Sequence, residues 1–280
     1  MRFVRVAVRS LFVLAVTFPP ASGSAQQSLS PTLPSGQTVT PVYEGWYRNK
    51  DGTYSLSFGY FNRNSAERMS IPVGDSNFVS PGAPNQGQPT HFEPRRHWGV
   101  FAVVVPADFG TKKVTWTLRD RGQTFAIPGS LHTDWQIDAI EGEASADNTP
   151  PALSFTEGGP VGVGPFGITS APLRATVGQP LSLTVYVKDD GKTGTTGANG
   201  VRVGTPVSIA WFKHQGPGDV TFGTPTSRLT PTGGNAVTTA TFSKAGDYIV
   251  RLRANDSSVT SAGHSQCCWS NGFIKVTVTP

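Results

Sequence analysis

The stretch Phe242–Asp256, FSKAGDYIVRLRAND, constrains the fold of this chain more than any other. A turn at Ala245-Gly246-Asp247 leads into a strict alternation of residues. One face carries Tyr248, Val250, Leu252 and Ala254, and the other carries Ile249, Arg251 and Arg253. This period of two predicts a β-strand that buries one of its faces.

The rest of the chain favours the same kind of structure. It has 32 Gly and 23 Pro among 280 residues and is 15% charged, and no stretch of ten or more residues keeps a helical period. Runs rich in Val, Thr and aromatic residues recur between turn signals instead, as they do in β proteins. We therefore predict an all-β protein whose length suits two domains of roughly 100 residues each.

The N-terminus has the pattern of a cleaved signal peptide over residues 1–25. Arg2, Arg5 and Arg9 precede the apolar run Leu11–Phe18, and small residues end at Ala25. The apolar run is too short to cross a membrane, and no cysteine lies near the cleavage site to carry a lipid. We expect an exported protein, periplasmic or extracellular, with no membrane span after cleavage.

Removal of that segment lowers the net charge. Three of the 23 Lys and Arg residues and none of the 18 Asp and Glu residues lie in it, which leaves +2 rather than +5. Arg95-Arg96 is a pair and not a patch, so the chain lacks the basic surface of a nucleic-acid-binding protein.

A first domain is predicted over residues 37–140, after a flexible leader over 26–36. Asn49–Gly52 and Arg119–Gly122 each lie between two strand-like runs and predict two hairpins. Trp98–Val105 is almost continuously apolar and is expected to be a central strand covered on both faces. We expect the long polar loop Ser80–Pro94 to lie on the surface.

A linker rich in Pro and Gly is predicted over residues 141–172, because a run such as Gly158–Pro165 cannot bury a core. The second domain then fills residues 173–280. Its expected strands B, C, E and G are 181–187, 207–212, 236–242 and 273–278. The stretch Phe242–Asp256 is expected to be strand F, and Trp211 is expected in the core.

This second domain resembles PKD-type or bacterial immunoglobulin-like domains. The resemblance is carried by Val177-Gly178-Gln179-Pro180 before strand B, by Trp211 on strand C, and by Gly246-x-Tyr248, the pattern of a tyrosine corner on strand F. It implies a β-sandwich but no activity, because such modules serve adhesion, display and spacing alike. The layout of the whole chain is also similar to that of uncharacterised secreted bacterial proteins, from which no activity carries over.

The sandwich topology brings two acidic loops together. The B–C loop begins with Asp189 and Asp190, the F–G loop begins with Asn255 and Asp256, and both loops emerge at the same end of such a sandwich. Oxygen ligands from several loops suit Ca²⁺, so these four residues are a candidate calcium site. The alternative is that each side chain caps its own turn.

Cys267 and Cys268 are adjacent and are the only cysteines. In an exported protein they indicate a disulfide, here a strained vicinal one, although burial beside Trp269 or pairing between molecules is also open.

Aromatic residues of the first domain are candidates for ligand binding. Trp46, Tyr47 and Trp135 are the candidates for exposure, where their rings would stack on sugars. The alternative is that the aromatic residues belong to the core, as is expected of Trp116, which is in phase with Val114 and Leu118, and of Trp98, which opens an apolar strand.

A metal or a catalytic site receives little support. His91, Glu93 and His97 resemble half of a metal site, but their spacing fits no helical motif and Pro94 forbids a regular helix. We therefore predict two immunoglobulin-like β-sandwiches without a catalytic role that act in binding, adhesion or surface structure, with a polysaccharide or a cell-surface protein as partner. A carbohydrate-binding protein and an accessory part of a secreted hydrolase are the alternatives.

Overall fold

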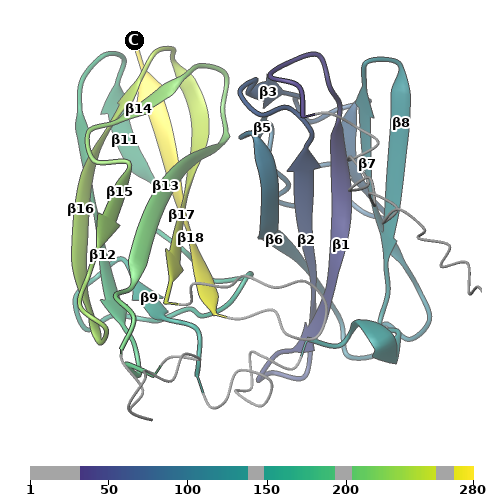
Figure 1. The fold of residues 1–280 in the computed structure, drawn as a ribbon, viewed down its shortest axis with the longest axis horizontal. Coiled ribbons are helices and arrows are strands. Elements are labelled where there is room, and N and C mark those ends of the chain that lie inside the picture. Colours follow the sequence, from purple (N-terminus) through teal and green to yellow (C-terminus); the bar gives the residue numbers. More distant parts are fainter. Residues whose placement is uncertain (1–31, 138–147, 193–203, 257–267) are drawn as a thin grey trace, which may run out of the picture. The chain divides into compact units, whose positions relative to one another are not determined.

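The chain folds into β-strands and one short 3-10 helix in the part that the computed structural model describes, which is residues 32–137, 148–192, 204–256 and 268–280 (Figure 1). The predicted signal peptide, 1–25, and residues 26–31 of the leader lie outside the described residues. No helix in the described ranges is both long enough and apolar enough to cross a membrane.

The first sandwich has two three-stranded antiparallel sheets and a short strand pair. One sheet has the order β1 (Val39–Arg48), β2 (Tyr54–Asn62), β6 (Arg95–Val105). The other has the order β4 (Asn77–Ser80), β7 (Val114–Asp120), β8 (Gln123–Gly129). β3 (Met69–Ser70) pairs with β5 (His91–Phe92), and the 3-10 helix η1 (Thr133–Trp135) follows β8. The sheets enclose an aromatic core around Phe58, Phe92 and Trp116.

Both hairpins of this sandwich are confirmed, and the role of β6 is not as expected. β1 pairs with β2 across Asn49–Gly52, and β7 pairs with β8 across a turn in which Arg121 and Gly122 have positive φ. β6, however, pairs only with β2 among the described strands, so it is an edge strand rather than the predicted central one. Val104 is accordingly 43% exposed.

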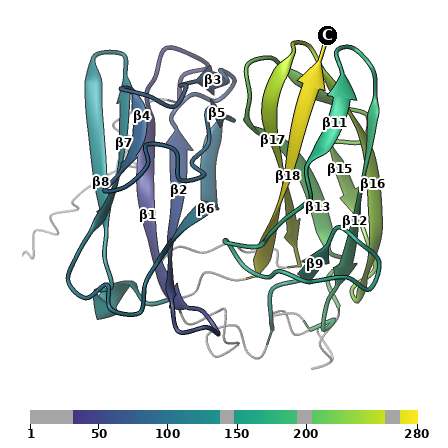
Figure 2. The ribbon, with the colours of Figure 1, turned by 180° about the vertical axis from the view of Figure 1, so that it is seen from behind.

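The second sandwich packs a six-stranded sheet on a four-stranded one. The larger sheet has the order β10 (Ile168–Thr169), β18 (Trp269–Thr279), β17 (Gly246–Asn255), β13 (Ser208–Gln215), β15 (Thr226–Arg228). β11 (Leu173–Thr176) also pairs with β18, and Figure 2 shows it beside that strand. The smaller sheet has the order β14 (Val220–Phe222), β16 (Gly233–Phe242), β12 (Leu181–Lys188), β9 (Ala152–Ser154).

This arrangement confirms the immunoglobulin-like fold. β12 pairs with β16 as strands B and E do, and β13, β17 and β18 are neighbours as strands C, F and G are. Trp211 is buried in the core, and the Tyr248 hydroxyl donates a hydrogen bond to the Lys244 carbonyl at 2.8 Å, which closes the tyrosine corner. The protein is therefore all-β and is built from two β-sandwiches.

The range predicted as a linker supplies strands to the second sandwich. β9 pairs with β12 and β10 pairs with β18, and Leu153 is fully buried in the second core. Residues 141–147 of that range lie outside the described residues. From Ala152 onward the range is thus part of the sandwich in spite of its Gly and Pro, because backbone pairing needs no apolar side chains. The division of the chain into domains stays a prediction.

The two sandwiches meet along a polar contact that we call the seam, formed by the outward face of β13, β17 and β18 and by residues 87–99. Thr32–Pro280 form one compact unit. The His214 Nε2–H donates to the Gly87 carbonyl at 2.7 Å, and the Thr90 amide donates to the His214 carbonyl at 2.8 Å. The loop Ser80–Pro94, expected on the surface, thus contributes buried residues to the seam, with Gln88 fully buried.

Asn271 and Gly99 fit closely at the seam. The Asn271 Nδ2 donates to the carbonyls of Gly99 (2.6 Å) and Pro165 (2.8 Å). Gly99 has φ +47°, and a Cβ there would lie 2.6 Å from Cζ2 of Trp269. Only glycine permits this approach without a shift of the indole.

Candidate functional site

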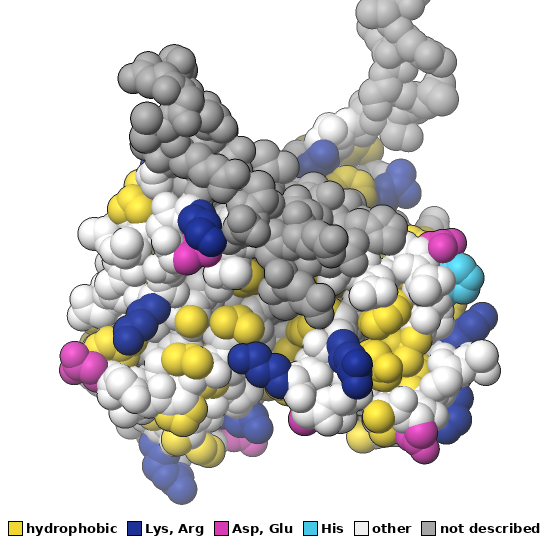
Figure 3. Space-filling model, turned by 90° about the horizontal axis from the view of Figure 1, so that it is seen from below, with side chains coloured by type: hydrophobic (Ala, Val, Ile, Leu, Met, Phe, Trp, Pro, Cys, Tyr) yellow, Lys and Arg dark blue, Asp and Glu magenta, His cyan; other side chains and the backbone are white. Residues whose placement is uncertain are grey.

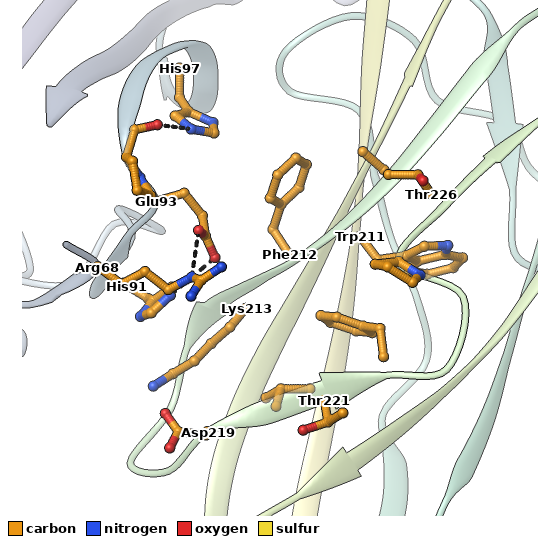
Figure 4. Close-up of a pocket in the computed structure, with 15 residues that line it drawn as sticks. Arg68, His91, Glu93, His97, Trp211, Phe212, Lys213, Asp219, Thr221 and Thr226 are labelled. Atoms are coloured by element: carbon orange, nitrogen blue, oxygen red, sulfur yellow. Dashed lines mark hydrogen bonds and ion pairs between the residues drawn. The ribbon is translucent and has the colours of Figure 1, made fainter. Parts of the chain in front are cut away.

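A cleft of about 620 Å³ lies where β5 of the first sandwich faces β13 and β14 of the second (Figure 4). The first sandwich contributes Arg68, His91, Glu93 and His97 to its lining. The second contributes aromatic and polar side chains that include Phe212, Lys213, Asp219, Thr221, Phe222 and Thr226. Its volume is within the usual range of ligand pockets.

Glu93 joins the charged groups on the first side of the cleft. Its carboxylate accepts hydrogen bonds from Arg68 Nε at 2.8 Å and from His91 Nε2 at 3.3 Å. Burial would raise the pKa of Glu93, but the hydrogen bonds from His91 and Arg68 outweigh burial and hold the pKa below its usual value. Glu93 is therefore ionised, and its carboxylate is paired with Arg68 and hydrogen-bonded to His91.

His97 also lines the cleft, and its imidazole stays neutral. Its Nε2–H donates to the Pro94 carbonyl at 3.2 Å, and its ring stacks on Tyr60 with centroids 4.9 Å apart. Burial, together with the positive charges of Arg251 and Arg253, lowers the pKa of His97 to about 3. His91 and His97 thus make separate contacts, and the described residues contain no group of three or more His, Cys, Asp or Glu side chains that could hold a metal ion.

Two arginines lie behind the cleft on the outward face of β17. Arg251 is only 3% exposed, donates to Asn271 Oδ1 at 2.9 Å and covers the Phe212 ring, with 4.5 Å between the guanidinium carbon and the ring centroid. Burial lowers the pKa of Arg251 to about 10, so it still carries its charge at neutral pH. Burial also lowers the pKa of the neighbouring Arg253. The alternation in the sequence placed both on the outward face but could not show that this face is covered.

The structure brings Asp189 and Asp256 together at the loop end of the second sandwich, as expected. Asp256 is 1% exposed, and burial together with the charge of Asp189 raises its pKa to about 8. Asp190 faces elsewhere: it accepts hydrogen bonds from Thr149 Oγ1 at 3.0 Å and from the Lys192 amide at 2.8 Å. At Asn255 the backbone carbonyl accepts a hydrogen bond from Ser208 Oγ at 2.9 Å. Calcium binding by these residues stays a prediction.

Replacing Asp256 with asparagine tests the state of this buried pair. Because the folded pKa lies above the ordinary value of 3.8, the folded protein binds the proton more tightly than the unfolded one, and stability falls as pH rises from about 4 to 8. We expect the unfolding free energy of D256N, relative to the original protein, to rise by about 1–3 kcal/mol between pH 5 and pH 8.5 in urea titrations. A difference that is the same at both pH values would contradict the raised pKa.

The same variant tests calcium. If Asp189 and Asp256 bind Ca²⁺, millimolar CaCl₂ raises the Tm of the original protein and not that of D256N. A Tm that is unchanged between EDTA and CaCl₂ would remove the calcium prediction.

Cys268 is buried beside the same loop end, with its Sγ 3.6 Å from the Asn148 carbonyl oxygen. It takes part in a disulfide. Cys267 lies outside the described residues, so the vicinal pairing of the two stays a prediction.

Of the three aromatic residues expected to be exposed, only Trp135 is. Trp46 donates from Nε1 to the His132 carbonyl at 2.7 Å, and the Tyr47 hydroxyl accepts the Phe166 amide at 2.9 Å. Both side chains are buried because η1 and the segment around Phe166 cover this end of β1. The expectation that Trp46 and Tyr47 are exposed is therefore wrong.

Trp135 is 45% exposed and stands at the edge of a second hollow, which we call the Trp135 groove. The groove measures about 580 Å³, and Tyr43, Ile127, Pro128, Ser130 and Lys113 line it with Trp135. The Trp135 and Tyr43 rings have centroids 5.6 Å apart. Figure 3 views the end of the molecule at which η1 lies in Figure 1 and shows hydrophobic side chains gathered in a patch near a histidine.

Comparisons with known proteins give structural likeness alone. No family model and no curated protein matches the chain. Among solved structures, the D00-D0 domain of intimin is 12% identical, with 87% of this chain and 100% of that chain covered and a TM-score of 0.27. Domains 4 and 5 of the S-layer protein SbsC are 11% identical (65% and 71% covered, TM-score 0.26). The fibronectin(III)-like modules of Clostridium thermocellum CbhA are 9% identical (86% and 94% covered, TM-score 0.24). TM-scores this low carry no argument, so the fold stands on the strand order described above.

Proposed function

We propose that this chain is an exported, non-catalytic β-sandwich protein that works as a surface module, in the periplasm or outside the cell, and that it binds polysaccharide at the Trp135 groove. The single observation that carries the proposal is the exposed Trp135 indole beside a groove of about 580 Å³. A single exposed apolar side chain is ordinary, but Trp135 adjoins other apolar residues that line the groove, and a contiguous exposed apolar patch on a protein surface marks an interaction site.

The groove suits a sugar chain because it combines ring faces with polar groups. Trp135 offers an exposed aromatic face against which the C–H face of a sugar ring packs, and the buried Tyr43 ring packs against the indole and holds it in place. Ser130 and Lys113 supply polar groups beside the indole. The Tyr43 hydroxyl donates a hydrogen bond to the Ser130 carbonyl at 2.7 Å, so its proton is not free for a ligand. Trp46 and Tyr47, being buried, hold the strand in place and take no part in binding.

Replacing Trp135 with alanine is the test. We expect the original protein to bind at least one polysaccharide of a panel in affinity electrophoresis, and W135A to bind it at least about tenfold more weakly, as truncation of an aromatic hot spot usually does. The matched control is Phe166→Ala, which removes an aromatic side chain that is 50% exposed and outside the groove. The proposal fails if no polysaccharide binds, or if W135A and F166A lose binding equally.

A further inference from the structure

The charges of Arg251 and Arg253 have no carboxylate partner among the described residues. Both side chains are largely buried, and neither takes part in an ion pair with the described residues. Within the described ranges, the partners of Arg251 are neutral, namely the Asn271 amide oxygen and the Phe212 ring, and Arg253 Nε has no acceptor. Buried charges in proteins are ordinarily paired, because removing a charge from water is expensive. Two such charges side by side indicate a place that an anion would stabilise.

Their positive charge reaches the cleft. The Arg251 guanidinium lies against Phe212, and Phe212 itself lines the cleft, so one ring separates this charge from the open space. His97, which also lines the cleft, has its pKa lowered by burial and by both arginines, an effect that requires them to be close.

The carboxylates near the cleft do not cancel this charge. Glu93 is held by Arg68 and His91. Glu44, buried nearby in the first sandwich, is held by Arg96 at 2.7 Å and 2.8 Å. The remaining carboxylate is that of Asp219, which lies beside Lys213. Burial lowers the pKa of Lys213, and the negative charge of Asp219 partly offsets this effect. With Arg251 and Arg253 behind the lining, the cleft has more positive than negative groups.

The rest of the lining favours a sugar over a simple anion. Figure 4 shows Phe212 standing between Glu93 on one side and Thr226 on the other, with Lys213 and Asp219 below. Phe222 adds a second ring close to Trp211, with centroids 6.5 Å apart. The exposed Thr221 and Thr226 place hydroxyl groups along the same wall. Aromatic faces with hydroxyl and charged groups at their edges match the alternating apolar and polar surfaces of a saccharide.

We propose that the cleft between the two sandwiches binds a carboxylate-bearing saccharide of the uronic-acid class, with its carboxylate toward Lys213 and the Arg251–Arg253 side and its sugar rings along Phe212 and Phe222. This site is separate from the Trp135 groove and does not depend on it.

Calorimetric titration of the full chain with oligogalacturonate and oligoalginate tests the proposal. We expect at least one of these uronates to bind and the neutral galacto-oligosaccharide of equal length to bind at least about tenfold more weakly. Binding should weaken as NaCl rises from 20 to 300 mM, because the contact includes opposite charges. Failure of both uronates overturns the proposal, as does equal binding of the neutral sugar. Binding of poly-L-glutamate as tight as that of the uronates would assign the cleft to acidic peptides and overturn it too.

Variants locate the site. Lys213→Gln and Arg253→Gln are each expected to weaken uronate binding by about fivefold, the effect of one partly screened charge. Lys112→Gln removes a charge from an exposed lysine of the first sandwich that lies outside the cleft, and W135A alters the Trp135 groove; both are expected to bind uronate normally. Because Arg253 is largely buried, the affinity of R253Q is interpreted only if its Tm stays close to that of the original protein. Lys213 is only half-buried, so the affinity of K213Q decides the test. Unchanged affinity in K213Q would refute the placement.

Discussion

Replacing Asn271 with alanine is expected to lower the free energy of unfolding by about 3–5 kcal/mol, because it leaves a buried charge without its acceptor. The Asn271 side chain is fully buried and makes three hydrogen bonds, one from Arg251 and two to the carbonyls of Gly99 and Pro165. Alanine removes all three at once and strands the Arg251 guanidinium. Urea denaturation followed by tryptophan fluorescence measures the change.

Two further variants show whether the buried charge is the cause. Thr277→Ala, an exposed position on the same strand, is expected to change stability by less than about 0.5 kcal/mol. The double variant N271A/R251M removes the charge together with its acceptor and should be more stable than N271A alone. If the double variant is less stable than N271A, the loss does not come from a stranded arginine.

The second large effect is a loss of stability in mild acid that depends on two histidines. Burial lowers the pKa of His214 to about 3, with the charge of Arg251 acting in the same direction, and His97 has a similar pKa. The unfolded chain takes up these protons near pH 6.5, whereas the folded protein does so only near pH 3. The unfolded state therefore binds more protons throughout this window, and the stabilisation, fully present above pH 6.5, is lost as pH falls toward 3.

Each histidine is expected to remove up to about 1.4 kcal/mol of stability per pH unit within this window. In the variant His214→Gln, the glutamine side chain still offers a donor to the Gly87 carbonyl, but it does not titrate. We expect the stability of H214Q relative to the original protein to improve by about 2 kcal/mol between pH 6.5 and pH 4.5. The carboxyl groups are the same in both proteins, so their contribution to the pH dependence of stability cancels when the two stabilities are subtracted at each pH. A difference that does not vary with pH would show that His214 is not held neutral by burial.

Local patterns predicted the strands and turns well, because a strand with one buried face leaves its period in the sequence. The hairpin at Asn49–Gly52 and the strand around Tyr248 are examples, and so is the meeting of Asp189 with Asp256, which follows from sandwich topology alone. The same reasoning was wrong for β6, since a continuous apolar run indicates two covered faces without showing whether strands or another sandwich cover them.

The candidate sites were harder to predict because they depend on exposure. Trp46 and Trp135 look alike in the sequence, yet one indole is buried under η1 and the other is open to solvent. Phe212 and Arg251 gave no signal of a site, because their partners come from another strand and from the other sandwich. No window of sequence contains both sides of such a contact.

The sequence by itself determined that this protein is all-β and that Arg251 and Arg253 lie on the face of their strand opposite Tyr248 and Leu252, because alternation is a property of the backbone. Only the tertiary structure decided what that outward face meets. Hydrogen bonds of His214 with Gly87 and Thr90, and of Asn271 with Gly99, cross the seam. This contact covers the outward face, buries the charges of Arg251 and Arg253, and leaves the cleft beside these two arginines. The physical reason is that burial and electrostatic environment are set by residues distant along the chain, which only the folded structure brings together.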